Sequence, residues 1–136
     1  GSLRHKRYAE PSDDSDGTRI LITRYRPRGI AKSEERWTVW DKRLAPSVAL
    51  LDEAFGKRRV DGKVVARDLA PIPWSAFADR YRDEMRRPES REAVSEYARR
   101  AADGETITLL CYCEDASRCH RSLAALLVRQ VARGSQ

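Results

Sequence analysis

The chain has 136 residues, 40% of them hydrophobic, and its 27 basic and 21 acidic side chains give a formal net charge of +6. This length suits one domain, and the apolar content excludes a fully disordered chain. The longest strongly apolar run, residues 106–113, excludes a membrane span, which needs roughly 18 apolar residues.

The first third of the chain predicts two strands and an arginine-rich loop. We expect a short edge strand near residues 6–8. A buried strand is predicted over residues 19–23, where β-branched and apolar side chains run between turn residues. Pro27 and Gly29 then stop regular structure. The loop of residues 24–29 therefore carries three arginines at the carboxyl end of a strand.

The middle of the chain predicts two helices. Ser33, followed by acidic residues, is a typical helix start. Trp37, Trp40 and Leu44 recur after it at helical spacing. A second, short helix is expected over residues 48–55.

Residues 57–72 are polar, with apolar residues at alternating positions. The Asp61-Gly62 pair is typical of a β-hairpin turn. We interpret this segment as an insertion or hairpin, with Lys57, Arg58 and Arg59 exposed.

The last part of the chain predicts helices around one strongly apolar strand. Apolar residues recur at helical spacing over residues 74–85 and 93–101. Residues 106–112 predict a strand covered on both faces, and Ser117 is the expected cap of a final helix. Together these elements predict an α/β fold, a small, mostly parallel sheet layered with helices, in a single domain of residues 3–133.

Two groups of polar residues follow the two buried strands. Arg24 and Arg28 follow the first strand, and the segment of residues 111–121 follows the last. In open α/β sheets, sites gather outside the carboxyl ends of the strands. We therefore expect the two groups to meet if these strands are neighbours. Arg24 and Arg28 would then bind a ligand or pair with Glu114 or Asp115.

All the cysteines of the chain, Cys111, Cys113 and Cys119, fall within nine residues. A secreted disulfide scaffold would spread an even number of cysteines along the chain. No apolar stretch follows the N-terminus as in a secretory signal, and Gly1-Ser2 resembles a cloning scar. We therefore expect a cytoplasmic protein with local chemistry at these thiols.

Cys119 is expected in the first turn of the final helix, where free N–H groups and the helix dipole favour a thiolate. His120 and Arg121 add positive charge beside it. The Arg121 guanidinium is also suited to hold a carboxylate or phosphate through two hydrogen bonds. This segment therefore predicts a nucleophilic or redox thiol, an anion site, or both.

Two other interpretations of this segment stay open. In the first, the cysteines are small buried hydrophobic residues and His120 is a helix cap. In the second, the segment binds zinc or iron, although its spacing is not that of a standard zinc finger or ribbon, and the adjacent residues Cys119 and His120 would form an awkward chelate. No Cys-x-x-Cys pair and no Cys-x5-Arg phosphate loop are present. The residues that would hold a metal ion are Cys111, Cys113, Cys119 and His120.

Blocks of sequence spread over most of the chain form a family pattern. The blocks are residues 6–11, 16–19, 24–29, 40, 44–47, 77, 80–85 and 108–110, together with residues 111–121, which end in Cys119-His120-Arg121. The chain resembles the YeaO-like proteins in these blocks, except over roughly residues 57–72. Those proteins belong to a family called domain of unknown function four-eight-eight, and the final block looks like the Cys-His-Arg block of the wider family. The resemblance implies a compact α/β fold and no settled activity.

Three positions depart from that pattern. Thr23 stands where YeaO-like relatives usually have aspartate, Arg26 where they usually have tryptophan, and Cys113 where the wider family tends to have glutamate. Loss of both acids raises the local positive charge and weakens any general acid–base interpretation built on them. The role of Cys113 stays open between a metal ligand and a resolving thiol.

These observations give one main hypothesis and two alternatives. In the main hypothesis, a small anionic ligand, with phosphate as one candidate for its charged group, is bound beside a reactive thiol, which Cys111 or Cys113 supports. The alternatives are a nucleic-acid-binding module and a Cys/His metal protein. No membrane association is expected, and both turnover and oligomeric state stay open. The residues expected to bind the anion are Arg24, Arg28 and Arg121, and those expected to act in catalysis are Cys119 and His120.

Overall fold

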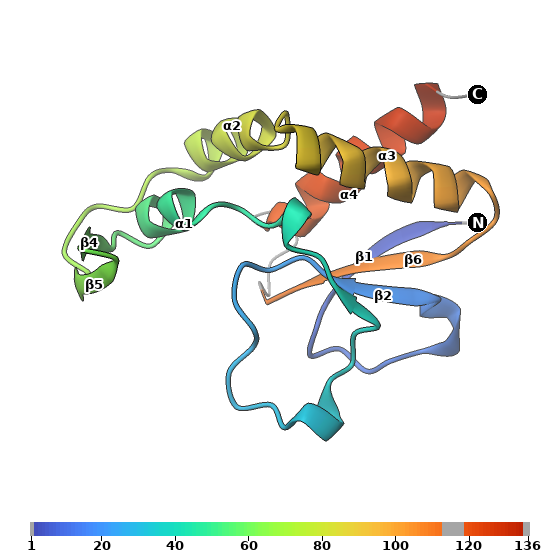
Figure 1. The fold of residues 1–136 in the computed structure, drawn as a ribbon, viewed down its shortest axis with the longest axis horizontal. Coiled ribbons are helices and arrows are strands. Elements are labelled where there is room, and N and C mark those ends of the chain that lie inside the picture. The colour runs from blue at the N-terminus through green and yellow to red at the C-terminus, as the bar shows by residue number, and fades with distance from the viewer. Residues whose placement is uncertain (1, 113–118, 135–136) are drawn as a thin grey trace.

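A four-stranded sheet with the strand order β1-β6-β2-β3 forms the centre of the molecule, and all of its neighbouring strands are parallel. The structure is a computed structural model and describes residues 2–112 and 119–134. Because the strands are parallel, their carboxyl ends lie at one edge of the sheet (Figure 1). The strands are β1 (Leu3–Arg7), β2 (Thr18–Leu21), β3 (Val39–Trp40) and β6 (Ile107–Cys111).

Helices cover one face of this sheet (Figure 1). The three longer helices each bury apolar residues at helical spacing, as Ala93, Val94, Tyr97 and Ala98 do in the helix of residues 88–102, whereas the short helix of residues 48–54 buries Leu50 alone. Pro88 occupies the first turn of α3, where its missing N–H costs no hydrogen bond. The helices are α1 (Val48–Ala54), α2 (Trp74–Glu84), α3 (Pro88–Ala102) and α4 (His120–Gly134).

The central strands are buried on both faces. Ile20 and Leu109 belong to the core beneath the helices. Leu21 and Leu110, which alternate with them, are also fully buried. The long segments on either side of β2 run below the sheet in Figure 1, opposite the helices. This coverage explains why every residue of β6 is buried.

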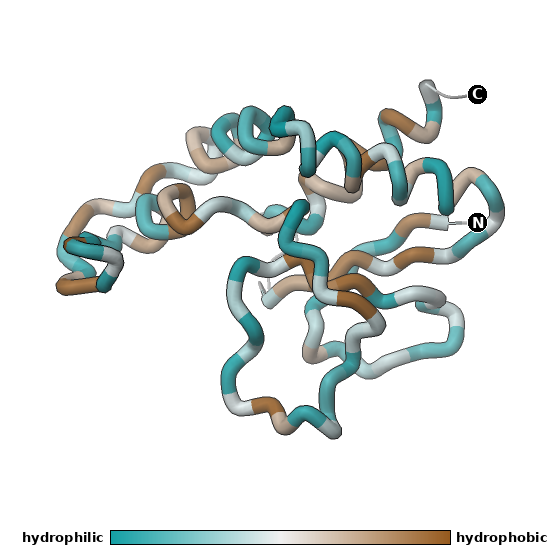
Figure 2. The backbone as a smooth tube through the Cα atoms, in the orientation of Figure 1, coloured by the Kyte–Doolittle hydropathy of each residue, from teal (hydrophilic) through white to brown (hydrophobic). Residues whose placement is uncertain are grey.

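Residues 58–66 form an antiparallel hairpin of β4 (Arg58–Val60) and β5 (Lys63–Ala66). Its turn residues, Asp61 and Gly62, have positive φ angles of 50° and 80°, as this kind of turn requires. The hairpin extends beyond α1, away from the main sheet (Figure 1). Figure 2 shows hydrophobic residues in the central strands and also on this hairpin. The predicted hairpin is confirmed.

The helix expected from Ser33 to Leu44 is wrong. The segment instead forms η2 (Lys32–Glu34), the strand β3 and η3 (Lys42–Leu44). Trp40 pairs with Leu21 in the sheet, and its ring N–H donates a hydrogen bond to the Thr23 carbonyl at 2.6 Å. These tertiary contacts override the helical spacing of the apolar residues. A further 3-10 turn, η1 (Asp14–Asp16), precedes β2.

The predicted α/β class, with a parallel sheet layered with helices, is confirmed, and so are the short helix after Ser47 and the helices over residues 74–84 and 88–102. The expected cap Ser117 lies outside the described residues. Within the described part of the chain, we find no helix with the length and apolar character needed to cross a membrane.

Candidate functional site

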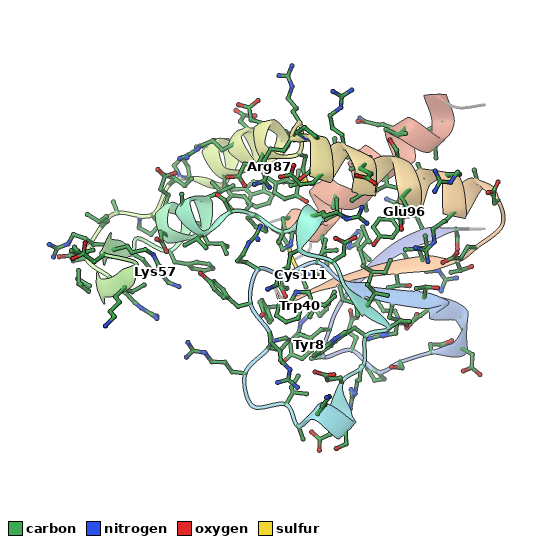
Figure 3. All side chains as sticks on the ribbon, viewed as in Figure 1. Tyr8, Trp40, Lys57, Arg87, Glu96 and Cys111 are labelled. Carbon is green, nitrogen blue, oxygen red and sulfur yellow. A yellow bond between two sulfur atoms is a disulfide. The ribbon has the colours of Figure 1, made fainter. Side chains whose placement is uncertain are left out.

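A cavity of about 930 Å³ opens at the carboxyl edge of the sheet. One wall is the loop that follows β2, and the opposite wall is formed by α1 and the β4–β5 hairpin. The start of α2 and the start of α4 contribute the remaining described residues. In Figure 3, Lys57 lies by the hairpin and Cys111 lies near the end of β6. The cavity therefore lies where the topology of an open α/β sheet places a site.

The described lining of this cavity is strongly basic and contains no carboxylate. Two of the basic residues have acidic partners outside the lining, because Arg26 pairs with Glu35 at 2.8 Å and Arg59 pairs with Asp52 at 2.7 Å. The others form no ion pair among the described residues, so positive charge is left for a ligand. The basic residues of the lining are Arg24, Arg26, Arg28, Lys57, Arg59 and Arg67.

Arg24 connects the loop after β2 to the chain before α1. Its guanidinium donates hydrogen bonds to the carbonyls of Pro46 at 3.0 Å, Ala45 at 3.3 Å and Lys42 at 3.4 Å. These acceptors are neutral, so Arg24 keeps its charge while its side chain is held in place. Arg28, by contrast, is exposed at the mouth of the cavity.

Aromatic residues give the cavity an apolar side. Trp74 and Phe77 of α2 stack with ring centroids 5.2 Å apart. Phe55 is 61% exposed, and Lys57 lies 5.5 Å from its ring centroid. Tyr112, which follows β6, donates a hydrogen bond to the Tyr25 carbonyl, and burial raises the pKa of Tyr112. The cavity therefore presents cations and flat apolar surfaces together.

His120 lies at the start of α4 and lines the cavity. Its Nε2 lies 2.6 Å from the Ile22 carbonyl, which accepts hydrogen bonds only, so Nε2 carries the proton and Nδ1 keeps its lone pair. Burial lowers the pKa of His120 to about 4. The imidazole is therefore neutral at neutral pH, in contrast to the positive charge that we expected it to add beside Cys119.

Cys111 and Cys119 are joined in a disulfide, with their Cα atoms 7.8 Å apart. Both are buried, at 0% and 1% exposure. Arg121, itself buried, donates a hydrogen bond from Nη1 to Cys111 Sγ at 3.3 Å. Cys119 is therefore a disulfide sulfur in this structure, and its reactivity as a thiol stays a prediction for the reduced protein. Once β6 and α4 pack together, Cys111 at the strand end is within reach of Cys119 just before the helix.

The structure brings only some of the predicted site residues together. Arg24, Arg28 and His120 line one cavity, so the two groups that follow the neighbouring strands β2 and β6 do meet. Cys119 and Arg121 are buried behind it. The roles of all five in binding or catalysis stay predictions. Cys113, Glu114 and Asp115 lie outside the described residues.

Sequence reasoning missed half of the cations of the lining. Lys57, Arg59 and Arg67 belong to the hairpin and the residues next to it, a segment for which the sequence predicts only an insertion with exposed cations. The basic run of residues 57–59 was the only signal available. It carried no information that the hairpin faces the loop after β2.

Comparison with known proteins gives the family. A family model described as the active DUF488-N3 subclade matches residues 3–132. The chain is 27% identical to the uncharacterized protein YeaO of Escherichia coli K12 over 131 residues, which cover 96% of this chain and 99% of the relative. It is 31% identical over 83 residues to the uncharacterized proteins Mb3100c of Mycobacterium bovis and Rv3073c of Mycobacterium tuberculosis, covering 61% of this chain and 59% of each relative.

No solved structure matches the chain. The resemblance to the YeaO-like proteins is confirmed by a family match that spans nearly all of the sequence and by the full-length alignment to YeaO. The chain belongs to the DUF488 family, within the group described as its active N3 subclade.

Proposed function

We propose that this protein binds a small organic anion, with phosphate as the preferred charged group, in the cavity at the carboxyl edge of the sheet. One observation carries the proposal: six basic side chains and no carboxylate line a single cavity among the described residues. Guanidinium groups match the geometry of phosphate oxygens and bind them through paired, charge-assisted hydrogen bonds.

The size and walls of the cavity support an organic anion rather than a bare ion. Its volume of about 930 Å³ is that of a site for an organic molecule, since such sites span roughly 300–1,000 Å³. Trp74, Phe77 and Phe55 offer apolar surface for the uncharged part of the ligand. Arg28 and Arg67, which have no acidic partner among the described residues, are the groups best placed to bind its charged part.

The proposal is tested by calorimetry with pyrophosphate, adenosine monophosphate and uncharged adenosine. Adenosine monophosphate should bind most tightly and adenosine weakly. Arg28→Ala and Arg67→Ala should each weaken binding roughly tenfold, the effect of losing a charge-assisted hydrogen bond worth about 1.5 kcal/mol. Arg86→Ala is the matched control, because its side chain is 83% exposed and lies just after α2, outside the cavity. Equal affinities in all three variants would overturn the proposal.

The cysteines form the second part of the proposal, in which Cys119, next to His120, is a reactive thiol and Cys111 is its resolving partner. The bond between the two sulfurs supports this, because a nucleophilic and a resolving cysteine must be able to form it. We place the protein in the cytoplasm, where a disulfide in a mesophile is usually catalytic or redox-sensing. The description of its subclade as active agrees with such a role.

This part is tested on protein that a dithiol reagent has reduced. Iodoacetamide at neutral pH should label Cys119 first, as located by mass spectrometry of the peptides. The Cys119→Ser variant should lose this fast phase. Equal labelling rates at all three cysteines of the wild type would contradict a privileged thiol.

A second candidate function is the binding of single-stranded nucleic acid. It is favoured by exposed aromatic rings beside the cations, since Phe55 is 61% and Tyr25 46% exposed. Binding of a fluorescent oligonucleotide should then fall steeply with salt. Tight binding of the oligonucleotide, with no measurable binding of adenosine monophosphate, would favour this candidate over the small-anion site.

A further inference from the structure

We propose that Cys111, Cys119 and His120 form a metal site in the dithiol state of the protein, with zinc-like divalent cations as its ligand class. The ligand atoms of these three residues all lie within 4.8 Å of one another, and all three residues are buried. They come from two elements, the end of β6 and the start of α4. Two thiolates and an imidazole are a donor set that zinc prefers. The proposal is independent of anion binding in the cavity.

The spacing of the two cysteines fits a shared cation. Their Cα atoms are 7.8 Å apart. A disulfide usually joins Cα atoms that are about 4.4–6.8 Å apart. Two zinc–sulfur bonds of about 2.3 Å in tetrahedral geometry hold the sulfurs roughly 3.8 Å apart, which suits cysteines on a more widely spaced backbone.

The surroundings of His120 resemble those of a metal-bound histidine. Its Nε2–H donates to the Ile22 carbonyl at 2.6 Å. In metal sites the ring nitrogen that does not bind the metal commonly donates to a backbone carbonyl, which fixes the tautomer and the ring orientation. The Tyr81 ring, 5.6 Å away between centroids, packs against the imidazole. Nδ1 therefore has a free lone pair for a metal ion, and the ring that carries it is already held in place.

Arg121 supplies a similar contact to the sulfur. Its Nη1 donates to Cys111 Sγ at 3.3 Å from a buried position. A hydrogen bond of this kind stabilises a thiolate, which is the form that binds a metal ion. Both a sulfur and the imidazole of the proposed site thus have an outer partner that orients them.

The disulfide must open before a cation binds. One thiol of a dithiol reductant attacks one sulfur of the Cys111–Cys119 bond and forms a mixed disulfide with it. The second thiol of the reductant then attacks this mixed disulfide and releases the protein cysteine as a thiol. The protein gains two electrons and two protons, and the reductant leaves as its own disulfide. Binding of the cation then releases the two thiol protons. Oxidation of the cysteines back to the disulfide removes both sulfur ligands, so the site exists in only one redox state.

The test uses the full chain, reduced, freed of metal and kept under inert gas, with cobalt(II) as the probe. One cobalt ion per chain should bind, with a near-ultraviolet sulfur-to-cobalt band and strong visible bands of tetrahedral coordination. An equivalent of zinc(II) should remove these bands. Native mass spectrometry of the wild type should show one zinc ion on the reduced protein and none on the disulfide form, a readout that needs no variant.

Variants identify the ligands. Cys111→Ser and Cys119→Ser should each lose most of the sulfur band, and Cys113→Ser is the matched control that should keep it. His120→Ala should weaken cobalt binding at least roughly tenfold. His5→Ala, which changes the other histidine of the chain, should not.

Three results would overturn the site. One is the absence of the sulfur band in reduced wild type. Another is an unchanged band in Cys111→Ser or Cys119→Ser. The last is equal metal uptake by the disulfide and dithiol forms.

Discussion

At the scale of single residues, two arginines of the same loop have different surroundings. Arg24 donates to three backbone carbonyls, whereas Arg28 is exposed at the cavity. Arg24→Met should therefore lower the free energy of unfolding by about 1–2 kcal/mol, and Arg28→Met should change it by less than about 0.5 kcal/mol. Urea unfolding measures both. Similar losses in the two variants would contradict a structural role that is specific to Arg24.

Trp40 gives a second prediction at this scale. Its ring N–H donates to the Thr23 carbonyl, so Trp40→Phe should cost about 1 kcal/mol of stability in chemical unfolding. Trp37→Phe is the control, because the Trp37 ring face contacts the Arg26 guanidinium, which lies 5.7 Å from the ring centroid. Phenylalanine retains a ring face, so this variant should cost less. The reverse order of the two losses would show that the hydrogen bond does not hold β3 in place.

Single residues also show where sequence reasoning reaches its limit. Arg24, Arg28 and His120 could be placed near one another because they follow neighbouring parallel strands. The pairing of Cys111 with Cys119 could not be predicted, because it depends on how α4 sits on β6. The neutral state of His120 likewise depends on burial that only the packed molecule creates.

At the scale of elements, a buried network joins α3 to η3. The Tyr97 hydroxyl donates to Asp41, and Arg43 pairs with the same carboxylate at 2.8 Å. Burial alone would raise the pKa of Asp41, but the hydrogen bonds from Arg43 and Tyr97 hold it below its ordinary value. The network thus places a charged group between a helix and the sheet.

This network predicts a pH dependence of stability. Because the pKa of Asp41 is lower in the folded protein, its carboxylate stabilises the fold above the unfolded-state pKa of about 3.9. That contribution is lost as the pH falls through the folded-state value. Between pH 5 and 3, wild type should lose more unfolding free energy than Asp41→Asn. Asp79→Asn, at a site 80% exposed, should follow the wild-type curve.

The junction between η1 and β2 gives a further prediction. Gly17 has a φ of 64°, and a Cβ there would collide with the Thr106 backbone carbonyl at the start of β6. Gly104, with a φ of 106°, has open space around it. Gly17→Ala should therefore lower stability by at least about 2 kcal/mol, and Gly104→Ala by about 1 kcal/mol. Thermal unfolding of the two variants separates the stability cost of the steric collision from the stability cost of a positive φ angle.

Elements with a strong local pattern could be predicted from the sequence. The apolar run of β6, the stripes of α2 and α3 and the Asp61-Gly62 turn all formed as expected. The segment before Leu44 did not, because a two-residue strand leaves almost no periodic signal. Its conformation is decided by Trp40 and Thr38, which bond to the neighbouring strand.

At the scale of the whole molecule, the hairpin should be separable from the sheet. Its two strands pair only with each other, and its base is held by Leu69, whose N–H donates to the Gly56 carbonyl at 3.0 Å. Replacing residues 57–66 by a short Gly/Ser link should leave the melting temperature within a few degrees and weaken anion binding, because Lys57 and Arg59 are removed while Arg28 and Arg67 remain. Calorimetry with adenosine monophosphate measures the second effect.

The control for this replacement is the double variant Val60→Ser/Val65→Ser. Both valines are exposed, and neither lines the cavity. Their replacement should leave binding unchanged. Undiminished binding after removal of the hairpin would show that its cations do not contact the ligand.

The position of the hairpin also has a consequence for the cavity. Residues 57–67 supply Lys57, Arg59 and Arg67 to one side of the cavity, while the strands of the hairpin pair with no strand of the main sheet. Under our proposal, substitutions in this stretch alter the cations of one wall while every strand of the sheet keeps its partners.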